Sequence, residues 1–386
     1  MVPLELVARH GRMMKIFLCG DVMLGRGIDQ ALPQPCSPVL HEAYMDSATG
    51  YLRLAEEANG PIPLPVDLAY VWGTALEELK RAEPDVRIIN LETSVTRSDA
   101  FEPKGINYRM SPENALCLAA AGIDCCVLAN NHVLDAGREG LLDTLSTLWQ
   151  LHIKSAGAGH NLAQASAPAI LEVPGKGRLL VFSFACVTSG TPRRWAARPD
   201  AAGVNLLPGL SEASVTAIAH QVAETGRSGD IVIASIHWGP NWGYEIAEDQ
   251  RWFARELIDR AGVSIVHGHS AHHAKAVEVY KNRLILYGCG DFLNDYEGIK
   301  GYEEYRGDLA VMYLATIDVT TRDLRALEIV PLQIRRFQLV RPSRADSDWL
   351  QQTLDRESRP LGTTVKPIPD GRFAVSWACA PVGTSC

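Results

Sequence analysis

Residues 264–273 read SIVHGHSAHH, a short apolar run followed by four of the chain's 11 histidines. Imidazoles crowded at the end of a buried strand repel one another when they are protonated, so a cation or a hydrogen-bond network is needed to keep them neutral. The stretch therefore predicts a polar site at a strand end, to which other parts of the chain contribute.

Near-continuous apolar runs recur along the chain, for example MKIFLCG (14–20), VRIINLE (86–92) and DIVIASIHWG (230–239). Runs of this kind are typical of strands that are covered on both faces. Helix-like stretches lie between several of them, at 74–83, 111–122, 140–152, 211–226 and 247–262. This alternation predicts an α/β fold with a mostly parallel sheet, and the less regular final strands predict a mixed sheet there.

Length and composition narrow the class of protein. With 386 residues and a net charge of -8, the chain is long enough for one large domain or two, and it has no basic run that would suit nucleic acid. No apolar stretch is long enough for a signal peptide or a membrane span, which predicts a cytoplasmic protein with no membrane partner. The nine cysteines form no CxxC pair, so we expect reduced thiols in the core.

Polar side chains stand where the predicted strands end. Because the carboxyl ends of strands in an open α/β sheet line one crevice, these groups are expected to converge; polar caps scattered over separate loops are the alternative. Their carboxylate, amide and imidazole groups suit calcium, manganese, iron or zinc, and the oxygen donors favour a harder ion. They are Asp21, Asn90, Glu92, Asn130, Asn131, His132, His237, the histidines of 267–273 and Asp291.

Six motifs in order resemble the CapA, or poly-γ-glutamate capsule synthesis, family of the calcineurin-like metallophosphoesterase superfamily. They are GDVMLGR (20–26), NLETS (90–94), ANNHVLDAG (129–137), HWG (237–239), GHSAHH (268–273) and GDFLND (290–295). The resemblance implies a four-layer α/β/β/α sandwich with a metal site at the carboxyl ends of the strands. We expect its catalytic domain at 13–340. Met13 and Met14 directly precede the first predicted strand, which suggests a leader at 1–12, and the weaker pattern after about residue 340 suggests an extension or tail at 341–386.

Carried over by motif, the metal ligands would be Asp21, Glu92, Asn131, His237, His269 and His272, with His132 as a general acid. Three departures from the phosphoesterase pattern weaken the case for two tightly held transition metals. Met23 stands where that pattern has a histidine, Glu92 replaces a bridging aspartate, and two residues separate His269 from His272. We therefore expect one divalent ion, with calcium or manganese favoured over zinc or iron, and no ordinary phosphatase activity.

A smaller branch of the resemblance, the lasso-peptide epimerases, suggests inversion of the Cα of a precursor peptide's C-terminal residue. Such a reaction needs a base, an acid and stabilisation of the enolate between them. We expect His132 with Asp135 as one acid/base pair, and His267 or His273 with Asp291 or Asp295 as the other. Two other classes remain open: a metal-dependent hydrolase of phosphoester or γ-glutamyl amide bonds, and a non-catalytic subunit of a polymer-synthesis complex.

The substrate is expected to be a peptide, held by polar and aromatic residues near these loops. The loop at 188–200, TSGTPRRWAARPD, has a composition that predicts a mobile, basic segment for substrate capture. Tyr302 and Tyr305 are expected to pack over the sheet edge. The predicted substrate-binding residues are Arg26, Asn90, Trp238, Trp242, Arg193 and Arg194; nothing in the sequence indicates the oligomeric state.

Overall fold

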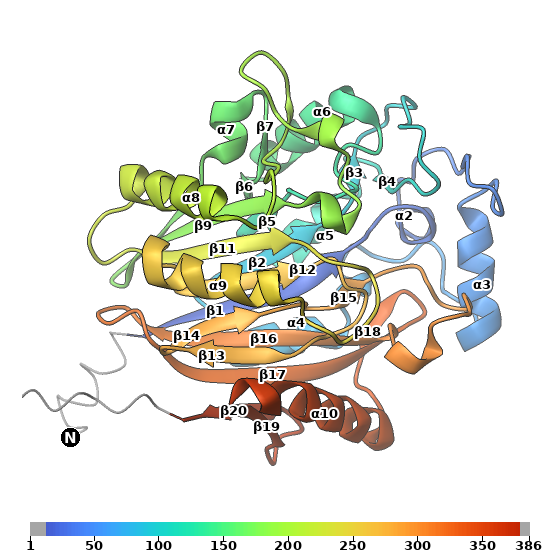
Figure 1. Ribbon diagram of the computed structural model, residues 1–386. Coiled ribbons are helices and arrows are strands. Elements are labelled where there is room, and N and C mark those ends of the chain that lie inside the picture. Colours follow the sequence, from blue (N-terminus) through green and yellow to red (C-terminus); the bar gives the residue numbers. More distant parts are fainter. Residues whose placement is uncertain (1–12, 379–386) are drawn as a thin grey trace, which may run out of the picture.

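Two β-sheets form the centre of the protein, whose computed structural model describes residues 13–378 (Figure 1). The first sheet has the strand order β19 (Thr363–Pro367), β20 (Phe373–Trp377), β17 (Leu324–Arg335), β16 (Leu309–Asp318), β1 (Met13–Val22), β2 (Val86–Leu91), β5 (Cys125–Val127) and β6 (Lys154–Ala156), with β15 (Asp291–Leu293) beside β1 and β18 (Gln338–Val340) beside β17. The second sheet has the order β13 (Val277–Tyr280), β14 (Arg283–Leu286), β12 (Ile265–His269), β11 (Ile231–His237), β9 (Gly177–Ala185) and β8 (Ala169–Val173).

Side chains alternate between the two faces of each strand, and this alternation builds three hydrophobic layers. Ile16 and Leu18 of β1 point between the sheets, where they join Ile233 and Ile265 of the second sheet. Phe17 instead points outward, toward the layer beneath α4 (Thr74–Ala82), α5 (Leu116–Ala120) and α6 (Gly137–Gln150). The outer face of the second sheet is covered by α8 (Glu212–Thr225) and α9 (Glu248–Ala261). The predicted four-layer α/β/β/α sandwich is confirmed.

Strand direction follows the predicted pattern. Strands β1, β2, β5 and β6 run parallel, as do β9, β11, β12 and β14. The later strands β16, β17, β20 and β19 are antiparallel, so the first sheet is mixed, as the irregular spacing of the final strands predicted.

Four of the five predicted helices match the structure closely, but the one at 111–122 is wrong in its first half. Helix α5 begins only at Leu116, because residues 111–115 form a turn. The Ser111 hydroxyl accepts a hydrogen bond from the Asn114 N–H, and the Asp29 carboxylate holds both the Ser111 N–H and the Asn114 amide. Polar side chains thus compete with the helix for this backbone.

The chain after residue 340 is part of the fold rather than a tail. Helix α10 (Arg344–Ser358) contacts β13 of the second sheet and β17 of the first, while β19 and β20 extend the first sheet (red in Figure 1). Leu350 and Leu354 enter the layer between the sheets. Predicted leader residues 1–12 and the last residues, 379–386, lie outside the described residues. The remaining short helices are α2 (Gly27–Ala31), α3 (Thr49–Asn59) and α7 (Leu162–Ser166).

Across residues 13–378, no helix combines the length and the apolar character that crossing a membrane requires.

Replacing Leu354 by alanine tests whether α10 belongs to the core. Leu354 is fully buried, so the cavity that remains should lower the free energy of unfolding by about 2–4 kcal/mol. Urea unfolding measures this, with Gln352→Ala on the exposed side of the same helix as the control. Equal stability of the two variants would show that α10 is only loosely attached.

Candidate metal centre and acid/base site

The carboxyl ends of strands from both sheets meet at one point. In the first sheet, Asp21 of β1 lies in register with Asp291 of β15 and Asn90 of β2. In the second, His237 of β11 is paired with His269 of β12. Gly20 permits the close approach of β1 and β15, since a Cβ there would collide with the Gly290 carbonyl oxygen. The predicted convergence of strand ends is therefore present for these residues.

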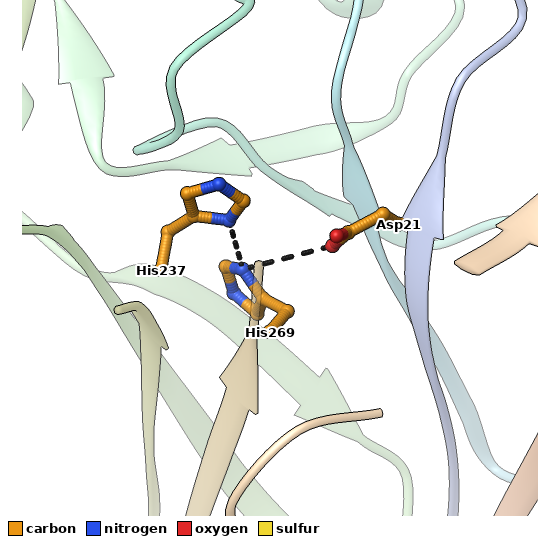
Figure 2. Close-up of side chains that lie close together, drawn as sticks. All are labelled: Asp21, His237 and His269. Carbon is orange, nitrogen blue, oxygen red and sulfur yellow. Dashed lines mark hydrogen bonds and ion pairs between the residues drawn. The ribbon is translucent and has the colours of Figure 1, made fainter. Parts of the chain in front are cut away.

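Two groups of possible ligands share Asp21. One is Asp21 with His237 and His269, and the other is Asp21 with His272 and Asp291; within each group the ligand atoms lie within 4.8 Å of one another. Figure 2 shows the first group, with Asp21 facing the two imidazoles across the junction of the sheets. His269 Nδ1 lies 2.7 Å from His237 Nδ1 and 3.9 Å from Asp21 Oδ1.

The far nitrogens of these two imidazoles are held by neighbours. His237 Nε2 lies 2.9 Å from Asn131 Oδ1, and His269 Nε2 lies 2.8 Å from the Ser235 hydroxyl. Such contacts fix the ring orientation and leave the Nδ1 atoms facing Asp21. Asn131, a predicted metal ligand, thus lies beside the imidazole of His237, with its amide oxygen facing His237 Nε2.

The charges of this region fit a divalent cation. Burial, and then Asp291, raise the pKa of Asp21 to about 7, and burial also raises the pKa of Glu92. Within residues 13–378, the ion pairs of Asp21, Glu92 and Asp291 are all with histidines, and burial lowers the pKa of His237 and of His269 well below the usual value. Neutral imidazoles beside uncompensated carboxylates are the forms in which these side chains bind metals.

Glu92 lies at the edge of this arrangement. Its Oε1 is 3.8 Å from His237 Nε2 and 3.9 Å from His132 Nε2. It belongs to neither of the two ligand groups, whereas Asp21 belongs to both. Glu92 is therefore close to the possible ligands without being grouped with them. Its position instead connects the metal-binding residues with His132.

His132 and Asp135 form the predicted pair. His132 Nδ1 lies 2.6 Å from Asp135 Oδ2, while the other Asp135 oxygen accepts a hydrogen bond of 2.7 Å from Lys104 Nζ. The Tyr108 N–H also donates to Asp135. Burial lowers the pKa of His132 to about 4, so the imidazole is neutral and its Nε2 lone pair is directed to the Glu92 side.

A second imidazole–carboxylate pair is formed by His272, not by His267 or His273 as predicted. His272 Nδ1 lies 2.9 Å from Asp291 Oδ1, and Asp291 Oδ2 accepts a hydrogen bond from Asn294. Burial opposes the charge of His272, but the Asp291 carboxylate outweighs it, so the pKa of His272 is raised. The two pairs are therefore shifted in opposite directions.

Three predicted catalytic residues do structural work. His267 bridges the sheets, because its Nε2 donates to the Cys19 carbonyl and its Nδ1 lies 3.0 Å from Ser235 Oγ. The ring of His273 packs against Tyr244 and Tyr305, and its Nε2 accepts from the Gly243 N–H.

The third, Asp295, is not a free acid or base. Its carboxylate forms a buried ion pair with Arg26, with Nη2 2.5 Å from Oδ1, and Arg26 pairs with Glu42 as well. Arg26 consequently offers no free charge to a substrate, although it borders the cavity described below.

Most of the predicted substrate-binding residues lie elsewhere. Asn90 donates to Asp21 and accepts from Asn130 inside the site, and Trp238 is buried with its indole N–H on the Tyr287 carbonyl. Arg194 pairs with Glu102, and neither it nor Arg193 borders the cavity. The 188–200 loop is organised around two 3-10 turns and the buried Trp195.

A cavity of about 560 Å³ opens beside His272 and Asn294. Two aromatic residues line it: Trp242, for which substrate binding stays a prediction, and Tyr302, which was expected to pack over the sheet edge. Two partners were not predicted from the sequence: Lys104, which pairs with Asp135, and Asn294, which donates to Asp291. The Asn294 position next to Asp295 in GDFLND was the only sequence signal for it.

Replacing Asp21 by asparagine should change how stability depends on pH. A carboxyl group whose pKa is raised on folding stabilises the folded protein at low pH, and this contribution is lost as the pH rises from the ordinary value of 3.8 through about 7. In metal-free protein, the gain in unfolding free energy of Asp21→Asn over wild type should therefore be about 2 kcal/mol larger at pH 8 than at pH 5. Urea titrations with a chelator measure it, and parallel pH curves would contradict it.

Comparisons with known proteins agree with the motifs. The family described as bacterial capsule synthesis protein PGA_cap matches residues 15–296. The chain is 46% identical over 362 residues to a probable polyglutamine synthesis accessory protein of Mycobacterium tuberculosis, covering 93% of this chain and 95% of that protein. It is 27% identical to the PGA biosynthesis protein CapA of Bacillus subtilis, covering 74% of this chain and 70% of that protein.

Among solved structures, the chain is similar to a phosphatase from Mycoplasma pneumoniae, with a TM-score of 0.45 and 12% identity over 86% of this chain and 95% of that one. This likeness is too remote to carry an argument about activity. The motif order, the family match and the mycobacterial relative agree, and the chain belongs to the PGA_cap family of bacterial capsule synthesis proteins.

Proposed function

We propose that the protein is a metal-dependent acid/base enzyme that inverts a Cα centre in a peptide. The observation that carries this proposal is the presence of two imidazole–carboxylate pairs around one metal-binding group. His132–Asp135 follows β5 of the first sheet and lies beside Glu92, whereas His272–Asp291 lies beside Asp21. Epimerisation requires one group that removes a proton and another that supplies one.

The opposite pKa shifts support a division of roles. His132 is neutral, with Nδ1 engaged by Asp135, so its Nε2 would accept the Cα proton. The pKa of His272 is raised by Asp291, so its Nε2 would return a proton. A divalent cation held by Asp21, His237 and His269 would stabilise negative charge on the substrate carbonyl.

The cysteines give no support to covalent catalysis. All seven in the described part of the chain are buried. Burial raises the pKa of Cys19 and of Cys289, the two thiols whose charge would interact with Asp21, so both remain protonated. Proton transfer without a protein nucleophile is the chemistry that the remaining groups favour.

The mycobacterial relative is named for polyglutamine synthesis and the Bacillus subtilis relative for PGA biosynthesis, and polyglutamine is a chain of amide-linked amino acids. This supports a peptide-like substrate for the present protein. The proposal extends to a narrower substrate, the C-terminal residue of a ribosomally made lasso-peptide precursor, and to a reaction in the cytoplasm.

A metal-dependent hydrolase is the second candidate, and one observation favours it. Asp21 belongs to both ligand groups, so its carboxylate has the position of a bridge between two cations, the second held by His272 and Asp291. Two bridged ions are typical of hydrolases that activate water. His272 would then be a ligand and not an acid, which separates the two candidates.

Deuterium incorporation tests the epimerase. Candidate peptides incubated with the metal-loaded protein in D₂O should gain one deuteron at Cα without bond cleavage, as seen by mass spectrometry and chiral analysis. His132→Gln and His272→Gln should each slow the exchange by on the order of 100-fold or more. The exposed His160→Gln is the control and should exchange normally. Bond cleavage in place of exchange would favour the hydrolase. The absence of both reactions would favour a non-catalytic subunit.

Metal stoichiometry gives an independent test. With His272 free to donate a proton, the active protein should contain one divalent ion per chain, and His272→Gln should retain it. His237→Ala should lose it, because it removes a nitrogen of the first group. Elemental analysis of the purified proteins measures both. Two ions in the active protein, one of which is lost in His272→Gln, would support the hydrolase.

A further inference from the structure

We infer that the cavity beside His272 is a subsite for a peptide segment that carries a bulky apolar side chain and a carboxylate. The inference rests on the proposed function, because it places this segment next to the residue whose Cα reacts. Nothing in the comparisons assigns the cavity a ligand.

The cavity begins at the acid/base pair. His272 and Asn294 both line it, and both contact the Asp291 carboxylate. From there an aromatic wall leads outward: the Trp242 ring lies 5.2 Å from the His272 ring and stacks on Tyr302 at 4.3 Å with an interplanar angle of 5°. An occupant that rests on this wall therefore reaches His272.

The mouth of the cavity gathers apolar side chains that are left in solvent. Tyr44, Ile299 and Tyr302 line it and are 65%, 45% and 52% exposed. Ile299 and Tyr302 belong to the connection between β15 and β16, whereas Tyr44 comes from a distant part of the chain and reaches the same cavity. Exposed apolar side chains that cluster around a hollow are typical of a binding site for an apolar group.

The charges of the mouth favour an anionic ligand. Lys300 and Arg335 line the cavity and form no ion pair with any residue between 13 and 378. In contrast, Arg306 is neutralised by Asp308 at 2.8 Å. Two carboxylates of the lining, Glu297 and Glu303, are also outside ion pairs within residues 13–378, but their oxygens accept hydrogen bonds: Glu297 from Asn59 and from the Arg336 and Phe337 N–H groups, and Glu303 from the Gly301 N–H.

The size of the cavity fits a short segment. Its volume of about 560 Å³ lies in the middle of the range of about 300–1,000 Å³ that is usual for sites that enclose a small ligand. Two or three residues with one aromatic or large aliphatic side chain would fill it. The aromatic wall and the unpaired cations thus select an acidic peptide with a bulky apolar residue.

Peptide binding to the full chain tests this subsite. The probes are acetyl-Ala-Trp-Glu-Ala-amide and two versions with alanine for Trp or lysine for Glu, measured by calorimetry on His132→Gln protein to prevent turnover. The Trp-Glu probe should bind about tenfold more tightly than either version. In this His132→Gln background, a further Tyr302→Ala substitution should weaken binding of the Trp-Glu probe about tenfold. A further Lys300→Glu substitution should abolish the preference for the probe with Glu over the probe with Lys.

Trp149→Ala is the matched control, since Trp149 is 78% exposed on α6 and does not line the cavity. It should leave all three affinities unchanged. Equal binding of the three probes, or insensitivity to Tyr302→Ala, would overturn the subsite. If the protein binds the probe selectively but catalyses no Cα exchange, only the proposed function is overturned. If exchange occurs but its rate does not depend on the apolar side chain, only the subsite is overturned.

Discussion

The carboxylate of Asp21 is the constraint on which the arrangement of the site depends. It is fully buried at the junction of the two sheets, beside Asp291 and with no Lys or Arg paired to it among the described residues. A buried anion without a partner is costly, and a cation shared with the imidazoles of the second sheet removes that cost. The same ion would fasten β1 to β11 and β12, so ligand binding and alignment of the sheets are coupled.

His267 supports this alignment independently of any cation. Its hydrogen bond to the Cys19 carbonyl joins β12 to β1 two residues before His269 and Asp21, both of which belong to a possible ligand group. Ser235 contacts both His267 and His269, so a single hydroxyl links the structural imidazole to the one that faces Asp21. The histidines of this turn therefore differ in position: His267 cross-links the sheets, His269 faces Asp21, and His272 pairs with Asp291.

Much of this arrangement could be predicted from the sequence. A residue of a metal-binding type at the end of an apolar run indicates both the chemistry of the side chain and its position at a strand end. Asp21, His237, His269 and the His132–Asp135 pair follow from that pattern together with the family resemblance. His267 could not be separated from His269 in this way: both project from the same face of one strand, but His267 lies about 6.6 Å deeper along it, where the opposite sheet is within reach.

Other features depend on packing that has no local signature. The pairing of Lys104 with Asp135 joins two loops, and the position of Tyr302 depends on its stacking on Trp242. Helix α10 has 15 residues, but only Leu350 and Leu354 among its buried residues are apolar, and β19 and β20 have five residues each. Their apolar residues therefore gave too weak a period to predict α10 or the strands that extend the sheet.

The cavity and the ligand groups come from different structural sources. The ligands stand on strand ends fixed by two sheets, while the outer cavity is built largely by the connection between β15 and β16 and by the end of β17. Substitutions in that rim would leave the strand ends in place. Related chains that share the same strand-end residues can thus differ in the ligand that their rim binds. Exchanging the segment 296–307 between relatives offers a way to change ligand preference while the strand-end residues stay the same.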